Sequence, residues 1–377
     1  MGNRRCSPRT DRTRSGRRMN GVGVFTEEQN DLRVMIRSLL DKRSDMRAAI
    51  DTDRGYQEPL WQQLCEVGIA SLAIPEEFGG AGFGAIESHV VLEELGRSLT
   101  PSPMLGSVVL AGQALLVSGD HEACERLLPG IAEGSSIAAL CWAGSVWSDD
   151  DVPVTVTDGT LTGVAEYVLD GLYADVLVVA ASADGTVSLY EVDPSAAGVT
   201  RRNTPTMDPT RRLSTVEFAG VTGRKIDTAP DTLAKVRDIA CTALSADQIG
   251  AAAASLDMTV EYSRTRVQFG RPIGSFQALK HRMADMYVLL ESAKSVSYAA
   301  ARSLAEQLPS AHDDAGVAKV HCSEALSHIA ADSIQIHGGI AITWEHDAHL
   351  YFKRAHGSSQ LFGRPSEYVN RYAPAAV

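Results

Sequence analysis

The spacing of apolar residues divides the chain into a helical region, a region of strands and a second helical region. From about Thr26 to Gly134, apolar residues recur at intervals of three and four, which is typical of amphipathic helices. Thr26 and the polar residues 27–29 that follow it predict an N-cap and a first helical turn. Further helices are expected around Trp61 and over residues 86–99.

Near Ile137 the pattern changes to an alternation of apolar and polar residues, as in half-buried β-strands. Asp-Gly and Pro-Ser pairs separate the alternating runs and are typical of turns. The strands are expected at residues 152–157, 161–162, 176–180, 187–192 and 213–218. These runs predict a small β-domain over residues 136–229.

The helical period returns at about Pro230 and continues towards the end of the chain. Four helices are expected at residues 232–265, 276–307, 311–337 and 344–356, with a shorter one after Pro365. Long helices joined by short loops pack as an antiparallel bundle. The predicted fold is α+β and mainly α: a basic tail (1–20), an N-terminal helical domain (21–135), the middle β-domain (136–229) and a C-terminal four-helix bundle (230–377).

The segment 264–281, RTRVQFGRPIGSFQALKH, joins two of the predicted long helices and carries several groups suited to a nucleotide. It offers a planar guanidinium for phosphate oxygens, an aromatic ring and a side-chain amide. Surface arginines are more often simply solvated, but here all eighteen residues resemble the flavin-contacting segment of the acyl-CoA dehydrogenase family. The glycine-rich loop 72–84 is similar to that family's N-terminal signature. The order of the three domains also resembles the family, so the likeness covers nearly the whole chain after residue 20.

The resemblance implies FAD as the cofactor, with its adenosine-pyrophosphate half held by the C-terminal bundle of a neighbouring subunit. The residues that match this role are Arg266, Phe269, Gln277, Gln335, Gly338 and Gly339. Arg266 would pair with the pyrophosphate as a planar, permanently charged fork. The Gln-x-x-Gly-Gly turn at 335–339 would let the backbone approach phosphate oxygens, and its glycines could also end a helix.

The residues that match the flavin-ring half of the family's site depart from its pattern. The family places a Thr-Glu-Pro…Gly-Ser-Asp loop and a Trp-Ile-Thr-Asn-Gly strand around the ring. The matching loop here, 140–149, is shortened and has no Thr-Glu-Pro. In the matching strand, Tyr167 replaces the tryptophan and Leu169 replaces the threonine, and leucine cannot donate a hydrogen bond. The sequence therefore predicts an intact adenosine half and an eroded ring half.

The family also needs a base that removes a proton from Cα of an acyl-CoA thioester. His356 occupies the place of the usual glutamate, and Ala240 occupies the place that carries the base in other members. Cys241 stands where the family often keeps an arginine that positions the substrate. A neutral histidine could accept the proton, since an unperturbed imidazole has a pKa of about 6.5. The sequence leaves open whether His356 is the base or a polar residue in a retired site.

Composition excludes several other classes of protein. A net charge of −12 argues against nucleic acid as a partner, and no run of eighteen apolar residues exists, so no membrane span is predicted. The six cysteines form no C-x-x-C pair, which fits a reduced cytoplasm. His346 and His349, at i and i+3, complete no recognised ligand set, so no metal is assigned. Residues 1–18, with seven arginines and one aspartate, are expected to be a disordered tail or to precede a true start at Met19.

Three functions remain compatible with these residues. The first is an FAD-dependent acyl-CoA dehydrogenase acting on a lipid or steroid side chain, with electron-transfer flavoprotein as the acceptor. The second is the partner subunit of a heterotetrameric acyl-CoA dehydrogenase, which lacks the base and completes the FAD site of another subunit. The third is a flavin-dependent monooxygenase on the same fold. A homo-oligomer or heterotetramer is expected, because the residues at 266–277 serve a neighbour's flavin.

Overall fold

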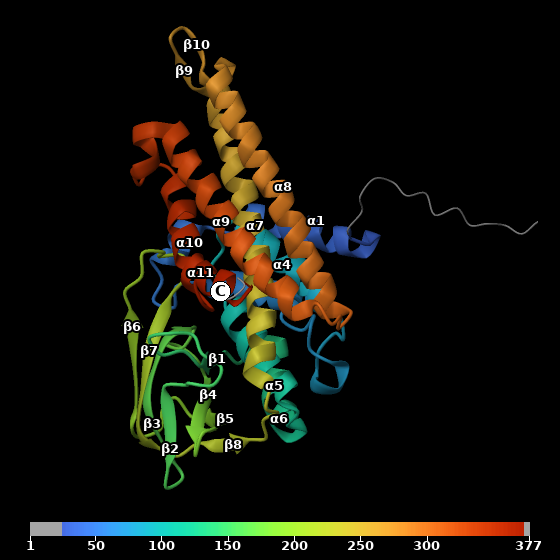
Figure 1. Cartoon of the computed structure of the whole chain (residues 1–377), viewed down its shortest axis with the longest axis vertical. Coiled ribbons are helices and arrows are strands. Elements are labelled where there is room, and N and C mark those ends of the chain that lie inside the picture. Colours follow the sequence, from blue (N-terminus) through green and yellow to red (C-terminus); the bar gives the residue numbers. More distant parts are fainter. Residues whose placement is uncertain (1–24, 373–377) are drawn as a thin grey trace, which may run out of the picture.

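The computed structural model describes residues 25–372, and it confirms the predicted fold class: a helical region, a sheet and a second helical region (Figure 1). The first helical region contains α1 (Glu27–Arg43), α2 (Met46–Ile50), α3 (Glu58–Glu66), η1 (Glu76–Phe78), α4 (Ala85–Arg97), η2 (Met104–Gly112), α5 (Gln113–Ser118) and α6 (His121–Glu133). The predicted cap of α1 is present: Thr26 Oγ1 accepts from the Gln29 backbone, and the Gln29 side chain accepts from the Thr26 backbone. The basic tail expected at 1–20 lies outside the described residues.

One eight-stranded sheet follows, in the order β6-β7-β3-β2-β4-β5-β8, with β1 pairing in parallel with β4. Its strands are β1 (Ala138–Cys141), β2 (Val154–Thr157), β3 (Thr160–Leu169), β4 (Val176–Ala183), β5 (Thr186–Val192), β6 (Val199–Thr204), β7 (Leu213–Val221) and β8 (Arg224–Ile226). In β4, Leu177 and Val179 pack on one face, whereas Val178 and Ala180 join the core shared with the helices. This strand is therefore buried on both faces.

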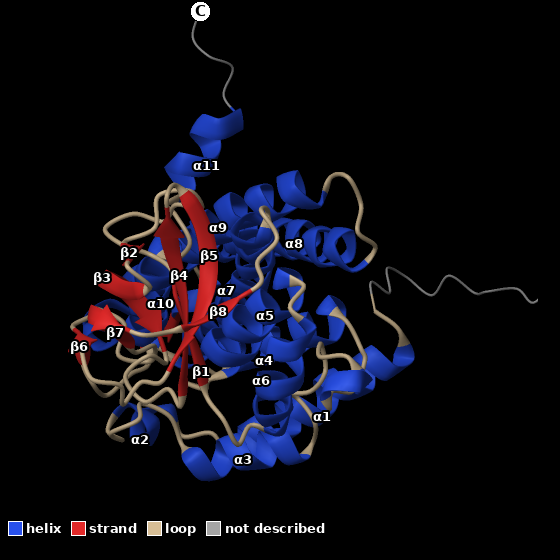
Figure 2. Ribbon diagram, turned by 90° about the horizontal axis from the view of Figure 1, so that it is seen from below, coloured by secondary structure: helices blue, strands red, loops and turns tan. Residues whose placement is uncertain are grey.

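The second helical region has α7 as its central helix. It contains α7 (Thr232–Thr265), β9 (Val267–Gln268), β10 (Arg271–Pro272), η3 (Ile273–Ser275), α8 (Gln277–Ala305), α9 (Ala311–His337), η4 (Gly338–Ile342), α10 (Ala348–Gln360) and α11 (Pro365–Tyr372). Seen from below, the helices lie beside the sheet and α11 extends from the upper edge of the molecule (Figure 2). Among the described residues, α7 alone is long and apolar enough to cross a membrane, and 83% of its apolar window is buried inside the protein.

Candidate functional site

The C-terminal end of α7 projects from the bundle as a short hairpin. Arg266 is the C-cap of α7, and β9 pairs with β10 through Gln268 and Arg271. Phe269 and Gly270, with φ of 55° and 75°, form the two-residue turn, a geometry that suits the twist of a hairpin. The turn directs the Phe269 ring outwards, where it is 90% exposed. We call residues 266–277 the arm; it lies at the far end of the molecule in Figure 1.

The predicted cofactor residues of the arm point away from the protein. Arg266 is exposed, and its guanidinium forms no hydrogen bond or ion pair with any residue in the range 25–372. The Phe269 ring meets the edge of Phe276, with centroids 6.0 Å apart, and the Arg271 guanidinium lies 4.1 Å from the Phe276 ring. Gln277 is exposed at the start of α8. The arm therefore presents cationic, aromatic and amide groups to something outside this chain.

The Gln-x-x-Gly-Gly turn lies at the same end of the bundle. Gly338 caps α9 with φ of 68°, and a Cβ added at Gly338 or Gly339 would meet nothing within 4 Å. The Tyr262 ring stacks on His337 with centroids 4.4 Å apart, and its hydroxyl donates to the His337 carbonyl at 3.3 Å. Because Tyr262 precedes Arg266 by one helical turn, this stack brings the two predicted parts of the adenosine site to one end. Gln335, in the last turn of α9, is exposed.

His356 lies on α10, away from the arm and next to the β-domain. Its side chain is exposed, its ring meets Phe352 at 4.5 Å between centroids, and none of its ring nitrogens bonds to a described residue. The following residue, Gly357, approaches the loop between β6 and β7 so closely that an added Cβ would lie 3.1 Å from Asp208 Cβ. The structure therefore does not bring His356 together with Arg266.

The positions matching the alternative base and the substrate arginine are both buried, and Tyr368 of α11 closes the second of them. Ala240 and Cys241 are 0% and 1% exposed. Cys241 Sγ lies 3.1 Å from the Tyr368 hydroxyl, which also donates to the Phe362 carbonyl at 2.6 Å. Burial raises the pKa of the Cys241 thiol, so the thiol stays protonated at neutral pH. This face of α7 is packed against the chain's own C-terminal segment.

The loop between β1 and β2, which matches the family's ring-binding loop, is folded against α7. Trp142 is 1% exposed and its indole donates to the Ser148 carbonyl at 2.7 Å. Trp147 meets the rings of both Trp142 and Phe362, with centroids 5.4 and 5.1 Å apart. Asp149 pairs with the buried Arg237 of α7 at 2.7 Å. The aromatic groups of this loop are thus used in packing.

The strand that matches the family's ring-binding strand is irregular. The pairing of β3 with β7 shifts register between Ala165 and Val168, and Tyr167 within that shift has φ of 55°. Leu169 is buried, and Asp170 after it has φ of 58°. Burial raises the pKa of the Asp170 carboxyl to about 7, and its Oδ2 has no hydrogen-bond partner. This strand supplies no hydroxyl where the family has a threonine.

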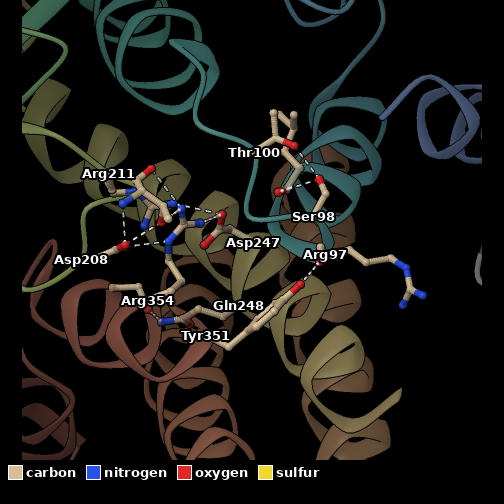
Figure 3. Close-up of polar contacts among 12 residues, drawn as sticks. Arg97, Ser98, Thr100, Asp208, Arg211, Asp247, Gln248, Tyr351 and Arg354 are labelled. Carbon is tan, nitrogen blue, oxygen red and sulfur yellow. Dashed lines mark hydrogen bonds and ion pairs between the residues drawn. The ribbon is translucent and has the colours of Figure 1, made fainter. Parts of the chain in front are cut away.

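A buried charged network that the sequence did not reveal ties α10 to α7 and to the β-domain (Figure 3). Arg354 donates to Asp208 Oδ2 and to Asp247 Oδ1, both at 2.8 Å, and also to Thr210. Arg211 pairs with Asp247 at 3.0 Å. Burial and the nearby Arg354 lower the pKa of Arg211. The network is nevertheless balanced in charge, because the two arginines face the two carboxylates of Asp208 and Asp247. The network fixes α10 two residues before His356.

Lys319 of α9 holds the end of α10 that follows His356. It is 0% exposed, and its Nζ donates to the carbonyls of Ser358 and Ser359 at 3.2 and 3.0 Å. Burial lowers its pKa to about 8. A cation near the last turn of a helix interacts favourably with the helix dipole, which compensates part of the cost of burial. One signal in the sequence could have revealed it: Lys319 shares a helical face with the small residues Ala315 and Cys322.

The histidines near residue 346 serve packing. Helix α10 begins at Ala348, later than the expected 344, because residues 343–346 form a turn and His346 Nδ1 accepts from the Ala348 backbone. The expected helix 344–356 would have placed His346 and His349 on one helical face, and this expectation was wrong because His346 precedes α10. His346 packs on His337 and His349 packs on Trp344. No group of three metal-ligating side chains occurs in the part of the chain described.

Comparisons with known proteins match both helical regions. Residues 26–135 match the model for the acyl-CoA dehydrogenase N-terminal domain, and residues 239–365 match that for the C-terminal domain. Acyl-CoA dehydrogenase IpdE2 of Mycobacterium tuberculosis is 45% identical over 350 residues, covering 92% of this chain and 96% of that protein. The chain belongs to the acyl-CoA dehydrogenase family. IpdE2 of Mycolicibacterium smegmatis is 44% identical over 355 residues, with 92% and 98% covered.

Solved structures of other acyl-CoA dehydrogenases share the whole fold. The ChsE4-ChsE5 complex from Mycobacterium tuberculosis has a chain that is 29% identical, with a TM-score of 0.85 and coverage of 93% of this chain and 99% of that one. A variant of the steroid ACAD Tcur3481-Tcur3483 is 30% identical, with a TM-score of 0.85 and coverage of 92% and 96%. Homologues of this acyl-CoA dehydrogenase therefore include heteromeric complexes.

Acyl-CoA dehydrogenases are FAD-dependent oxidoreductases, and the two halves of an FAD site fit this chain differently. At the adenosine end, a guanidinium and open space above Gly338 and Gly339 suit a pyrophosphate. At the ring end, buried Leu169 offers no hydrogen bond, and Trp142 packs inside the chain. The residues present therefore fit the adenosine-pyrophosphate half, and they do not fit the ring half as the family builds it.

Proposed function

We propose that this chain is the partner subunit of a heteromeric acyl-CoA dehydrogenase that acts on a bulky acyl-CoA thioester such as a steroid derivative. The observation that carries the proposal is the contrast along α7. Its face at Cys241 is closed by Tyr368, whereas on the arm beyond its end Phe269 is 90% exposed and the exposed Arg266 side chain has no polar partner among residues 25–372. A heteromeric complex and a steroid ACAD among the similar structures support the same assignment.

In this assembly this chain would bind and position the FAD of the other subunit, and the other subunit would supply the base. Dehydrogenation removes a proton from Cα of the thioester and a hydride from Cβ, and FAD, when bound, would supply the acceptor for that hydride. Arg266 would pair with the pyrophosphate of the other subunit's FAD, and Phe269 and Gln277 would contact its adenosine portion. The turn at Gln335, Gly338 and Gly339 would let the backbone approach the phosphate oxygens. These roles follow from the family's pattern and the exposure of the six residues.

A second candidate function is a dehydrogenase that is active by itself with His356 as the base. One observation favours it: the imidazole is exposed, and its helix is held on both sides by Arg354 and Lys319. A neutral imidazole in a fixed position can accept a proton. Expression of the chain alone and with a partner subunit, described below, separates the two candidates.

The remaining assignments extend the proposal. The assembly is a heterotetramer under the partner-subunit proposal and a homotetramer under the second candidate, because in both the arm serves a neighbouring subunit. Electron-transfer flavoprotein is the electron acceptor. The protein acts in the cytoplasm, which fits the five described cysteines, all of which are free thiols: Cys65, Cys124, Cys141, Cys241 and Cys322.

The test is to express the chain alone and together with an acyl-CoA dehydrogenase subunit that carries the glutamate base. Flavin absorbance per subunit and thioester-dependent bleaching are then measured. We expect little flavin on the chain alone, and bound, reducible flavin on the complex. A homo-oligomer that holds stoichiometric FAD and turns over an acyl-CoA would refute the partner-subunit proposal.

Arg266→Lys in the complex tests the arm. It preserves the charge but removes the bidentate fork, so FAD affinity should fall by on the order of 1–3 kcal/mol. The matched control is Arg264→Lys, two residues earlier, where the side chain is 71% exposed and lies 3.7 Å from Glu261. Equal FAD affinity in the two variants would show that the arm does not touch the pyrophosphate.

A further inference from the structure

A large cavity lies on a different side of α7 from the face closed by Tyr368. Its volume is about 620 Å³, and its walls come from α4, η2, α7 and the connection between α8 and α9. Volumes of roughly 300–1,000 Å³ are typical of sites for small molecules. Leu308, in the α8–α9 connection, is 39% exposed and marks the outer part of the cavity. Thr242 and Ala243 of α7 line it, whereas Cys241, their neighbour, does not.

The inner wall is apolar and includes an unusual backbone. Leu92, Val108, Val109 and Ala243 line the cavity and are each less than 9% exposed. Val108 and Val109 belong to η2, a π-helix of nine residues that are all buried. π-Helical turns are rare and occur frequently at functional sites, because the wider turn costs stability. This segment thus has a backbone conformation that costs stability, and its side chains do not fill the adjacent cavity.

Three polar side chains that line the cavity have an atom with no hydrogen-bond partner. These atoms are Ser88 Oγ, His89 Nδ1 and Thr242 Oγ1, in residues that are 7%, 1% and 3% exposed. Buried polar groups are normally paired, so three unpaired ones around one cavity call for an explanation. Burial lowers the pKa of His89 to about 3, so its ring is neutral and bonds to Ser297 Oγ at 3.0 Å through Nε2. All three groups are therefore uncharged hydrogen-bonding groups.

We propose that this cavity binds a neutral, mainly apolar molecule of the lipid class that carries a hydroxyl or carbonyl oxygen. The apolar wall would hold the hydrocarbon part, and the unpaired groups of Ser88, His89 and Thr242 would bond to the oxygen. Two charged groups line the cavity: the Lys235 side chain is 54% exposed, and the half-buried Asp238 carboxylate is bonded to His312. An anionic headgroup would find no buried cation there. The site is separate from the proposed FAD arm.

The probe for the test is Nile red, a neutral apolar dye with a carbonyl oxygen, titrated into the full-length protein and followed by its fluorescence. We expect saturable binding to the wild type. Ala85→Phe, at a half-buried position of the wall, should narrow the cavity and weaken saturable binding at least tenfold while the thermal unfolding temperature stays near that of the wild type. Unchanged dye binding in that variant, or no saturable binding to the wild type, would overturn the proposal.

Thr242→Val tests the hydrogen-bonding wall with little change in shape. It should weaken dye binding about threefold to tenfold, the scale of one neutral hydrogen bond, and should not destabilise the free protein, because the lost hydroxyl had no partner. The matched control is Ser255→Ala, which removes another unpaired buried hydroxyl of α7 that does not line the cavity. Equal effects of the two variants on affinity would refute the assigned polar contact. Weaker dye binding in Arg266→Lys would refute the separation of this site from the arm.

Discussion

The arm at the end of the C-terminal bundle and the bundle's contact with the β-domain use the same residue types in opposite ways. Arg266 on the arm is exposed and unpaired among the described residues, whereas Arg354 is 2% exposed and bonded to two carboxylates. Phe269 on the arm is 90% exposed, whereas Tyr368 is 3% exposed and closes the face of α7 at Cys241. The side chains on the arm therefore contribute little to the stability of this chain. The side chains in the interior already form hydrogen bonds and contacts that stabilise the fold.

This difference separates residues that can serve another molecule from residues that serve the fold. A large aromatic ring exposed at a hairpin tip lacks the favourable free energy of burial, and a bound partner that covers the ring can supply it. A buried guanidinium between carboxylates cannot turn to a substrate without leaving charges unpaired. The comparison therefore predicts that substitutions on the arm affect binding, while substitutions in the interior affect folding. The following predictions are ordered by the size of the expected effect.

Arg354→Met should give the largest loss of stability. It leaves the buried carboxylates of Asp208 and Asp247 short of a partner, which typically costs about 3–5 kcal/mol in the free energy of unfolding. The matched variant is Arg266→Met on the arm, which should change the same quantity by less than about 0.5 kcal/mol. Denaturant-induced unfolding of both variants measures the difference. Similar values for the two would remove the distinction between arm and interior.

Asp170→Asn should stabilise the protein in a pH-dependent way. The folded carboxyl keeps its proton to about pH 7, whereas an ordinary aspartate titrates near 3.8. Between these values the folded state binds more protons, so the stability of the wild type falls as the pH rises from about 4 to 7. The advantage of the variant should be small at pH 4 and on the order of 3 kcal/mol at pH 8.

Thermal and denaturant unfolding at pH 4 and pH 8 measure this change in advantage. Asp150→Asn, in an exposed loop position, is the control and should show the same small effect at both pH values. An advantage of Asp170→Asn that does not depend on pH would mean that the buried carboxyl is not the source of the effect.

The elements and the arm could be predicted from the sequence because their signals are local. The expected range of the central helix, 232–265, agrees with α7. Three strands of the eight-stranded sheet escaped prediction for physical reasons: β1 is four buried residues without alternation, β6 has Val199 as its one apolar residue, and β8 has three residues. The two-residue strands β9 and β10 of the arm were not predicted either. Periodicity has nothing to detect in strands of this kind.

The buried network could not be predicted, because its partners lie far apart in the chain. Arg354 is separated from Asp208 by 146 residues and from Asp247 by 107. In a chain with 22% charged residues, the sequence alone does not show which aspartate or arginine is buried. The arm residues, in contrast, form one short continuous segment, which can be matched to the pattern of a family.

Tyr368→Phe should cause a moderate loss of stability. The variant removes the hydroxyl that donates to the Phe362 carbonyl and lies beside the Cys241 thiol, leaving a buried carbonyl without that donor. The expected cost is about 1–2 kcal/mol in the free energy of unfolding. Tyr287→Phe is the matched control, because Tyr287 is 56% exposed and should lose almost nothing. A Tyr368→Phe variant as stable as the control would show that the face of α7 at Cys241 is not sealed by this contact.

His356→Ala should have the smallest effect of all, when measured as the rate of thioester-driven flavin reduction in the complex with a subunit that carries the glutamate base. In the partner-subunit proposal the proton leaves through that glutamate, so the exposed imidazole of His356 takes no part, and its removal disturbs no hydrogen bond of its ring. If His356 is instead the base, the variant should abolish reduction in the purified chain. Loss of activity in that variant would move His356 from the group of surface residues to the reacting centre, and would overturn the proposal that a partner supplies the base.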